Sequence, residues 1–259
     1  MGNRNDLFRG MHTVPLADNI NCSFSAYASP ALVQTWSDRE VTLSSKGTSF
    51  GFVYSGEAVL STSTSSLVIR PGMYFSVHGE GSISGGAGFV CTQPEFRGLF
   101  TVGGPIEDLG RLRYIDGCSD TLLISPTLLG EPCFNFLYIP PGINQTAHTH
   151  PSLRIGMIVS GAGYCMADNK RLELLPGNLF ILHPDEIHSF HTADESLRLV
   201  IFHPDSDFGP SHDHHPMINR TIVKGISANS IDEIRTKEIS LQKPPAQDSI
   251  VQDTKGAFR

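Results

Sequence analysis

Residues 141–161 read PGINQTAHTHPSLRIGMIVSG, and residues 177–192 read GNLFILHPDEIHSFHT. In a β-strand, residues i and i+2 point to the same face, so His148 and His150 are predicted to project together. A third imidazole from an adjacent strand, that of His188, is predicted to meet them at one cation. Three neutral nitrogen ligands with an open position are typical of a catalytic metal site rather than a closed structural one.

Part of the first stretch has a counterpart earlier in the chain. VYSGEAVL (53–60) resembles IVSGAGYC (158–165), and Ser55 and Ser160 lie 160 − 55 = 105 positions apart. The same offset relates the Pro-Gly turn at 71–72 to the one at 176–177, and Phe75 to Phe180. A single offset that persists over a segment of this length indicates an internal repeat. We therefore expect two copies of one unit, at 20–105 and 106–210.

Each copy is predicted to be all-β. Short runs rich in aromatic and branched residues are bounded by Gly, Pro, Asn or Asp, which is typical of antiparallel sandwiches or barrels. Helical periodicity is nearly absent, and the best candidate is a short helix at 227–238 that Ser230 caps. The rest of 211–259 is predicted to be a polar C-terminal tail. The strand candidates are SFGFVYSGEAVLS, SSLVIR, MYFSVH, CFNFLYI, SLRIGMIV, NLFILH and LRLVIFH.

Composition excludes several classes of protein. The 19 Lys and Arg residues against 26 Asp and Glu give a net charge of −7, which argues against a nucleic-acid binder. No apolar run approaches the ~18 residues of a membrane helix, and the N-terminal residues lack the apolar centre of a secretory signal. The five cysteines are odd in number and contain no CxxC pair, which favours reduced thiols. We expect a cytoplasmic protein with a globular core.

The two quoted stretches resemble the paired motifs of the cupins. Gly142, His148-x-His150, position 154 and Gly161 reproduce the spacing of the first motif. Gly177 and His188, with positions 183 and 185 between them, reproduce the spacing of the second. The resemblance implies a bicupin: two tandem cupin (jelly-roll, or double-stranded β-helix) barrels, with His148, His150 and His188 as ligands of a divalent metal ion, zinc or iron(II).

One departure from the cupin pattern concerns the metal ligands. The position of the usual glutamate ligand is occupied by Arg154, whose guanidinium stays protonated and cannot ligate a cation. Unless Gln145 or a substrate atom fills the gap, the ligand set is three histidines. A divalent ion plus Arg154 would favour an anionic ligand, so Arg154 is predicted to clamp a substrate carboxylate as a catalytic and binding residue. The alternative is that Arg154 turns outward and pairs with an acidic residue such as Glu195.

A second departure concerns the first copy. Subtracting 105 from the positions of the three histidines gives Leu43, Ser45 and Ile83, none of which can replace an imidazole. The N-terminal barrel is therefore predicted to have lost its metal site and to act as a packing partner or lid.

Several other residues are weaker candidates for the site. Cys133 shares a strand face with Asn135 and is predicted either to line the pocket or to pack in the core. Tyr138, Tyr164 and Phe190 have the same two alternatives. We expect His183, His191 and His203 to be hydrogen-bonded structural residues. The histidines of SHDHHP (211–216) are predicted to be solvated.

A less complete resemblance is to the cupin module of the hydrazine-forming synthetases. It is carried by RLRYIDGCSDTLLISP (111–126), the HTHPSLRIG stretch and HPDSDFGPSHDHHPMINRT (203–221). Those enzymes join an N-hydroxylated amino acid to a second amino acid and hold zinc through three histidines. This resemblance implies an N–N bond-forming rearrangement, with a separate amino-acid-activating enzyme as partner.

The leading hypothesis is a metalloenzyme that acts on a small anionic substrate, such as an amino acid derivative. Zinc would support rearrangement or hydrolysis, and iron(II) would support oxygen chemistry, as in the thiol dioxygenases that also lack the motif glutamate. The rival hypothesis is a small-molecule-binding or sensor cupin without turnover. A homodimer is expected because exposed sheet edges are often covered by a second copy.

Overall fold

A computed structural model of the chain describes residues 10–237. The described residues up to Ser211 form one compact unit, and those from His212 onward form a second. Regular structure in both consists of strands and short 3₁₀ turns, without an α-helix among the described residues, so the predicted all-β class is confirmed. No described helix is long and apolar enough to cross a membrane. None of the five cysteines forms a disulfide.

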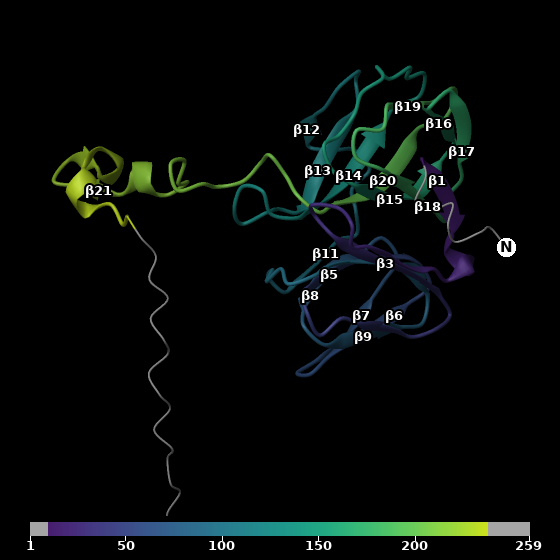
Figure 1. The fold of residues 1–259 in the computed structure, drawn as a ribbon, viewed down its shortest axis with the longest axis horizontal. Coiled ribbons are helices and arrows are strands. Elements are labelled where there is room, and N and C mark those ends of the chain that lie inside the picture. The colour runs from purple at the N-terminus through teal and green to yellow at the C-terminus, as the bar shows by residue number, and fades with distance from the viewer. Residues whose placement is uncertain (1–9, 238–259) are drawn as a thin grey trace, which may run out of the picture. The chain divides into compact units, whose positions relative to one another are not determined.

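The first half of the compact unit is a pair of antiparallel sheets (Figure 1). The six-stranded sheet has the order β11 (Thr101–Gly103), β8 (Tyr74–His78), β5 (Thr48–Ser55), β10 (Ala87–Gln93), β3 (Ala31–Ser37) and β2 (Asn21–Phe24). The four-stranded sheet has the order β4 (Val41–Leu43), β9 (Gly81–Ser84), β6 (Ala58–Thr62) and β7 (Ser66–Ile69).

The second half also consists of two antiparallel sheets, and its larger sheet includes a strand from the start of the chain, β1. Its seven-stranded sheet has the order β1 (His12–Pro15), β18 (Asn178–Leu182), β15 (Arg154–Gly161), β20 (Leu197–His203), β14 (Cys133–Ile139), β13 (Ser119–Ile124) and β12 (Leu112–Arg113). Its three-stranded sheet has the order β17 (Lys170–Leu174), β16 (Gly163–Ala167) and β19 (His188–His191). The 3₁₀ turn η2 (Leu16–Asp18) follows β1.

One detail of packing recurs at the spacing of the predicted repeat. Gly51 pairs with Phe75 across β5 and β8, and Gly156 pairs with Phe180 across β15 and β18. Each phenylalanine ring lies over its glycine so closely that a Cβ atom there would come within 2.2 Å of the ring. Both pairs differ by the same 105 positions, since 156 − 51 and 180 − 75 are equal.

Three apolar clusters hold the compact unit together. One fills the interior of the first half around Trp36 and Phe75, and another fills the interior of the second half around Phe180 and Leu199. The third joins the large sheets of the two halves, where Phe50 contacts Phe202 with ring centroids 5.2 Å apart. Successive side chains of a strand point to opposite faces. Alternate residues of β15 and β20 therefore pack in the interior of the second half, and the residues between them pack in the layer that joins the two halves.

The second unit is small and differs from the prediction for its region. It contains a two-stranded ribbon of β21 (Ile222–Val223) and β22 (Ile226–Ser227), with 3₁₀ turns η3 (Ile218–Arg220), η4 (Ala228–Ser230) and η5 (Asp232–Ile234). The helix predicted at 227–238 is therefore replaced by two separate turns, and residue 238 lies outside the described residues. Ser227, rather than Ser230, provides the capping hydroxyl, which accepts a hydrogen bond from the backbone N–H of Asn229.

Candidate metal centre

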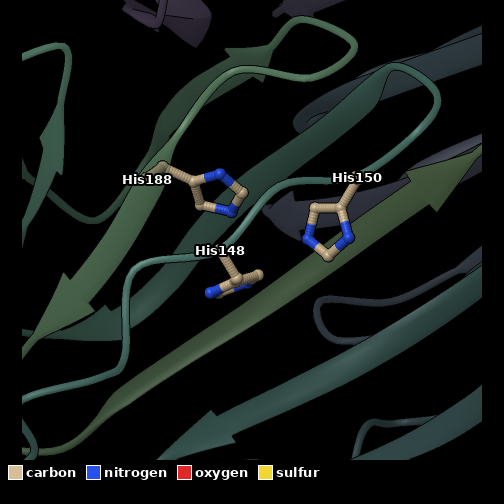
Figure 2. A group of neighbouring side chains, drawn as sticks. All are labelled: His148, His150 and His188. Atoms are coloured by element: carbon tan, nitrogen blue, oxygen red, sulfur yellow. The ribbon is translucent and has the colours of Figure 1, made fainter.

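Three histidines converge at one end of the second half. His188 is the first residue of β19, whereas His148 and His150 lie in the connection between β14 and β15, so the prediction that they share a strand is wrong. His148 is nevertheless held against β19 because it exchanges backbone hydrogen bonds with His188 at 2.9 and 3.0 Å. The rings face a common centre, with centroids 4.5 to 5.1 Å apart (Figure 2).

Backbone carbonyls fix which ring nitrogens are left for a ligand. Nδ1 of His148 donates to the carbonyl of Thr146 at 2.8 Å, and Nδ1 of His188 donates to that of Glu186 at 2.9 Å. Each bond leaves the Nε2 lone pair available, and Nε2 of His188 is buried without a partner. In metal-binding histidines the second ring nitrogen is oriented in the same way by a carbonyl or carboxylate.

Burial keeps the imidazoles of His150 and His188 in the neutral form that a metal requires. Desolvation lowers the pKa of His188 to about 4, and desolvation together with the nearby Arg154 lowers the pKa of His150 to about 3. One ligand nitrogen from each histidine lies within 4.8 Å of the others. Within residues 10–237 this is the one group of three such side chains, and its donor set fits a divalent metal ion.

The histidines open into a pocket in the second half. Two walls meet there, one from the large sheet and one from β19. The lining residues are Tyr114, Asp120, Asn135, Leu137, Gln145, His148, His150, Arg154, Phe180, Leu182, His188, Phe190, Ile201 and His203.

Arg154 lies in this pocket and does not turn outward to Glu195. It is only 8% exposed, and one guanidinium nitrogen (Nη1) donates to the carbonyls of Ser152 and Leu153 and to the Ser152 hydroxyl. The same nitrogen is 3.8 Å from a carboxylate oxygen of Asp205, while Nε is buried without a partner. An unpaired buried donor costs about 1–3 kcal/mol, so this atom is suited to receive a ligand.

Two carboxylates lie near the histidines, although neither belongs to the group that could hold a metal ion. Asp120 faces inward from β13 and lines the pocket, and burial raises its pKa. Asp205 lies behind Arg154. The two carboxylates offset part of the positive charge of Arg154 and a bound ion. Alternation within residues 119–124 could have placed Asp120 beside Leu122 on one face, but only the register of β13 with β14 shows that this face is the inner one.

His203 also lines the pocket, contrary to its predicted structural role. It is the last residue of β20 and points inward with Ile201, and its Nε2 is buried without a partner. Burial holds its pKa well below the usual value. Asn135 lines the same wall, with its side-chain oxygen likewise unpartnered.

Of the remaining aromatic and polar candidates, Gln145 and Phe190 line the pocket, and Tyr164 and Tyr138 do not. Gln145 lines the pocket, but its side-chain oxygen already accepts the backbone N–H of Phe190 at 3.1 Å. Phe190 is a pocket wall. Tyr164 is not, because it alternates with the inward Cys165 and stacks outside on His191, with centroids 4.7 Å apart. Tyr138 is also absent from the lining.

Cys133 and the other histidines take structural positions. Cys133 is buried beside the pocket but does not line it, and burial raises the pKa of its thiol to about 12. His183 accepts or donates a hydrogen bond with Tyr27 at 2.5 Å, and His191 bonds Ser189 at 2.8 Å. The histidines of the 211–216 segment are exposed.

The corresponding region of the first half carries no imidazole. Leu43 pairs with Gly81 as His148 pairs with His188, so the counterpart of His188 is Gly81 and not Ile83. The offset has grown from 105 to 188 − 81 = 107 because the turn before β19 is two residues longer. Leu43 and Ile83 are instead buried in the apolar interior.

Comparisons with known proteins identify the fold but not the chemistry of the site. The family model of the AraC-like ligand binding domain matches residues 140–209. A search of curated sequences gives no significant match.

Among solved structures, a cupin 2 conserved barrel domain protein from Leptotrichia buccalis is similar with a TM-score of 0.56 and 12% identity, covering 74% of this chain and 95% of its own. Salicylate 1,2-dioxygenase from Pseudaminobacter salicylatoxidans is similar with a TM-score of 0.53 and 12% identity, covering 74% and 83%. The same enzyme in adducts with gentisate gives 0.52 and 12%, covering 74% and 80%. The cupin fold expected from the motif spacing is confirmed.

Proposed function

We propose that this cupin-fold chain is a metal-dependent enzyme that acts on a small anionic molecule in its C-terminal barrel. The observation that supports this most strongly is that His148, His150 and His188 converge on a pocket whose wall also holds the buried Arg154. A structural metal site would be closed by protein ligands, whereas these three histidines border an open pocket.

Each group has a role that follows from its surroundings. The histidines hold the ion through their free nitrogens, and a bound divalent ion supplies Lewis-acid activation of a coordinated group. Arg154 binds the substrate carboxylate through its unpartnered Nε–H. Asp120, whose pKa burial raises, is the pocket group best suited to take up a proton from the substrate.

The identity of the ion decides between two reaction classes. Zinc supports a non-redox rearrangement, such as the N–N bond formation implied by the resemblance to the hydrazine-forming synthetases, in which a partner enzyme activates the amino acid. Iron(II) supports oxygen chemistry, which the fold similarity to salicylate 1,2-dioxygenase favours. Imidazole ligands suit both metals.

The test is conversion of carboxylic acids by protein purified without added metal. We expect the wild-type protein to contain zinc or iron and to convert at least one member of a panel of amino, hydroxy and aromatic acids, assayed by mass spectrometry with and without oxygen. His188→Ala should reduce the conversion rate more than 100-fold, and Arg154→Gln should raise KM more than it lowers kcat. Equal conversion by wild type and His188→Ala would refute the proposal.

A second candidate is a ligand-binding cupin without turnover. The observation that favours it is the match of the AraC-like ligand binding domain to residues 140–209, a range that includes all three histidines. Saturable binding of a panel member by the metal-loaded protein, with no product after many hours and with binding lost in His188→Ala, would establish this candidate instead.

A further inference from the structure

Arg154 and His203 are neighbours on the inner wall of the pocket. In the pairing of β15 with β20, Ile155 lies opposite Phe202 and Gly156 opposite Ile201. The next pair in this register is Arg154 with His203, and both line the pocket. Directly opposed side chains of antiparallel strands have Cβ atoms about 4.5–5.5 Å apart, so one small ligand can reach both.

Both side chains present an unsatisfied nitrogen. Nε of Arg154 and Nε2 of His203 are buried and have no hydrogen-bond partner. Native proteins seldom leave two adjacent buried nitrogens unpaired, because neither water nor protein then repays their desolvation. Nη1 of the Arg154 guanidinium is held in place by Ser152 and Leu153, and because the guanidinium is planar this fixes the direction of the free Nε–H.

The first half of the molecule provides an internal comparison. The strand register aligns Phe50 and Cys91 with Ile155 and Phe202, so Ser49 and Thr92 are the counterparts of Arg154 and His203. The Ser49 and Thr92 hydroxyls are buried and bond each other at 2.8 Å. In the first half, Ser49 and Thr92 thus meet each other's need for a hydrogen-bond partner. In the second half the corresponding residues are Arg154 and His203, which are larger and whose Nε and Nε2 atoms remain without a partner.

From this juxtaposition we infer that Arg154 and His203 form a two-donor subsite for a carboxylate, so that His203 is a substrate-binding residue. The two N–H groups match the two oxygens of a planar carboxylate, with the guanidinium supplying the charge and the imidazole, protonated at Nε2, supplying a neutral donor. The inference rests on the proposed function for the identity of the pocket as a substrate site, and it adds the group that selects the substrate class.

The test measures binding of propionate to the zinc-loaded protein by NMR titration, with propionamide as the uncharged isostere. We expect His203→Leu to weaken propionate binding roughly 10-fold or more, the loss typical of one hydrogen bond to a charged group. His203→Gln, which keeps an N–H donor, should recover part of it. Propionamide should bind more weakly than propionate to the wild-type protein, and His203→Leu should leave the zinc content unchanged.

The matched control is His191→Leu, which removes a buried histidine from the outer face of β19 and should leave propionate binding unchanged. As a measurement that needs no variant, the Nε2–H resonance of His203 in ¹⁵N-histidine-labelled wild type should shift when propionate is added. Unaltered propionate affinity in His203→Leu, no propionate binding to wild type, or an unmoved His203 resonance would each overturn the inference.

The two proposals can fail separately. Turnover of a carboxylate together with normal propionate binding in His203→Leu would refute the subsite alone. Propionate binding that depends on His203, in a protein that converts no carboxylate, would refute the enzyme and leave the subsite.

Discussion

His188 is held by hydrogen bonds in the orientation that the proposed metal site requires. Its Nδ1–H donates a hydrogen bond to the carbonyl of Glu186, and its backbone is hydrogen-bonded to that of His148. Its Nε2 is buried at the pocket and has no hydrogen-bond partner. The carbonyl bond sets the tautomer and the ring direction together. His148 repeats the arrangement with Thr146, so two of the three proposed ligands are oriented by the chain immediately before them.

The same burial predicts how pH affects the metal-free protein. The pKa of His188 falls from 6.5 to about 4 on folding, so between those values the unfolded chain takes up a proton that the folded protein does not. Folding stability is therefore lost as the pH falls from 6.5 toward 4, by up to about 1.4 kcal/mol per pH unit for this histidine.

Urea unfolding of the metal-free protein at pH 7, 6 and 5 measures this loss. In His188→Leu the free energy of unfolding should depend less steeply on pH than in the wild-type protein. Equal pH dependence in the two proteins would show that His188 is not buried in its neutral form.

At the scale of the element, the repeated glycine and phenylalanine pairs hold adjacent strands in the same way in both halves. Gly156 gives the Phe180 ring the space to lie flat against β15, and Gly51 does the same for Phe75 on β5. The positions agree because both pairs lie inside the segment over which the offset stays at 105.

Gly156→Ala should therefore destabilise the second half by about 1–3 kcal/mol, since its Cβ would lie 2.2 Å from the Phe180 ring. Urea unfolding monitored by fluorescence measures the change. Gly51→Ala is the matched variant in the first half and should cost a similar amount, while Phe180→Leu added to Gly156→Ala should recover part of the loss. An unchanged free energy of unfolding in Gly156→Ala would contradict the packing described above.

Elements were predictable from the sequence where their pattern is local. The strand runs followed from local patterns, whereas the repeat followed from the constant offset of 105 positions and the grouping of the three histidines from the spacing of two motifs. The prediction that His148 and His150 share a strand was wrong, because this segment is joined to its neighbour only by single bridges at Asn144 and His148. The Ile83 assignment failed because the two-residue insertion before His188 is visible only in the strand register.

At the scale of the whole molecule, the two halves share one apolar layer. Sheets from both contribute to it, and β1 from the start of the chain pairs with β18 of the second half (Figure 1). The first half thus supports the sheet from which Arg154 and His203 project. We therefore expect the first half to contribute to the proposed site by supporting this sheet.

Phe202 tests this coupling, because it is fully buried in the shared layer against Phe50. Phe202→Ala should lower the free energy of unfolding by about 3–5 kcal/mol and leave a single cooperative transition in calorimetry. Two separated transitions, with only one of them shifted, would show that the halves fold independently.

The residues of the site were predictable only in part, because some of them are brought there by contacts between distant parts of the chain. The proposed metal ligands and Arg154 belong to short motifs, but Asp120 and His203 reach the pocket through long-range strand pairing. Asp205 follows β20 and approaches Arg154 only in the folded chain. Their residue types carry no signal of their own, and the inner face of β13 or β20 is set by the partner strands.

The most direct test of the central claim is metal stoichiometry. Wild-type protein, purified without added metal, should carry close to one equivalent of zinc or iron by elemental analysis, and His188→Ala should retain less than about a tenth of it. His191→Ala, a buried histidine on the opposite face of the same strand, should keep the wild-type content. Equal metal content in wild type and His188→Ala, or no affinity of the wild-type protein for either ion, would contradict the assignment of the three histidines as a metal centre.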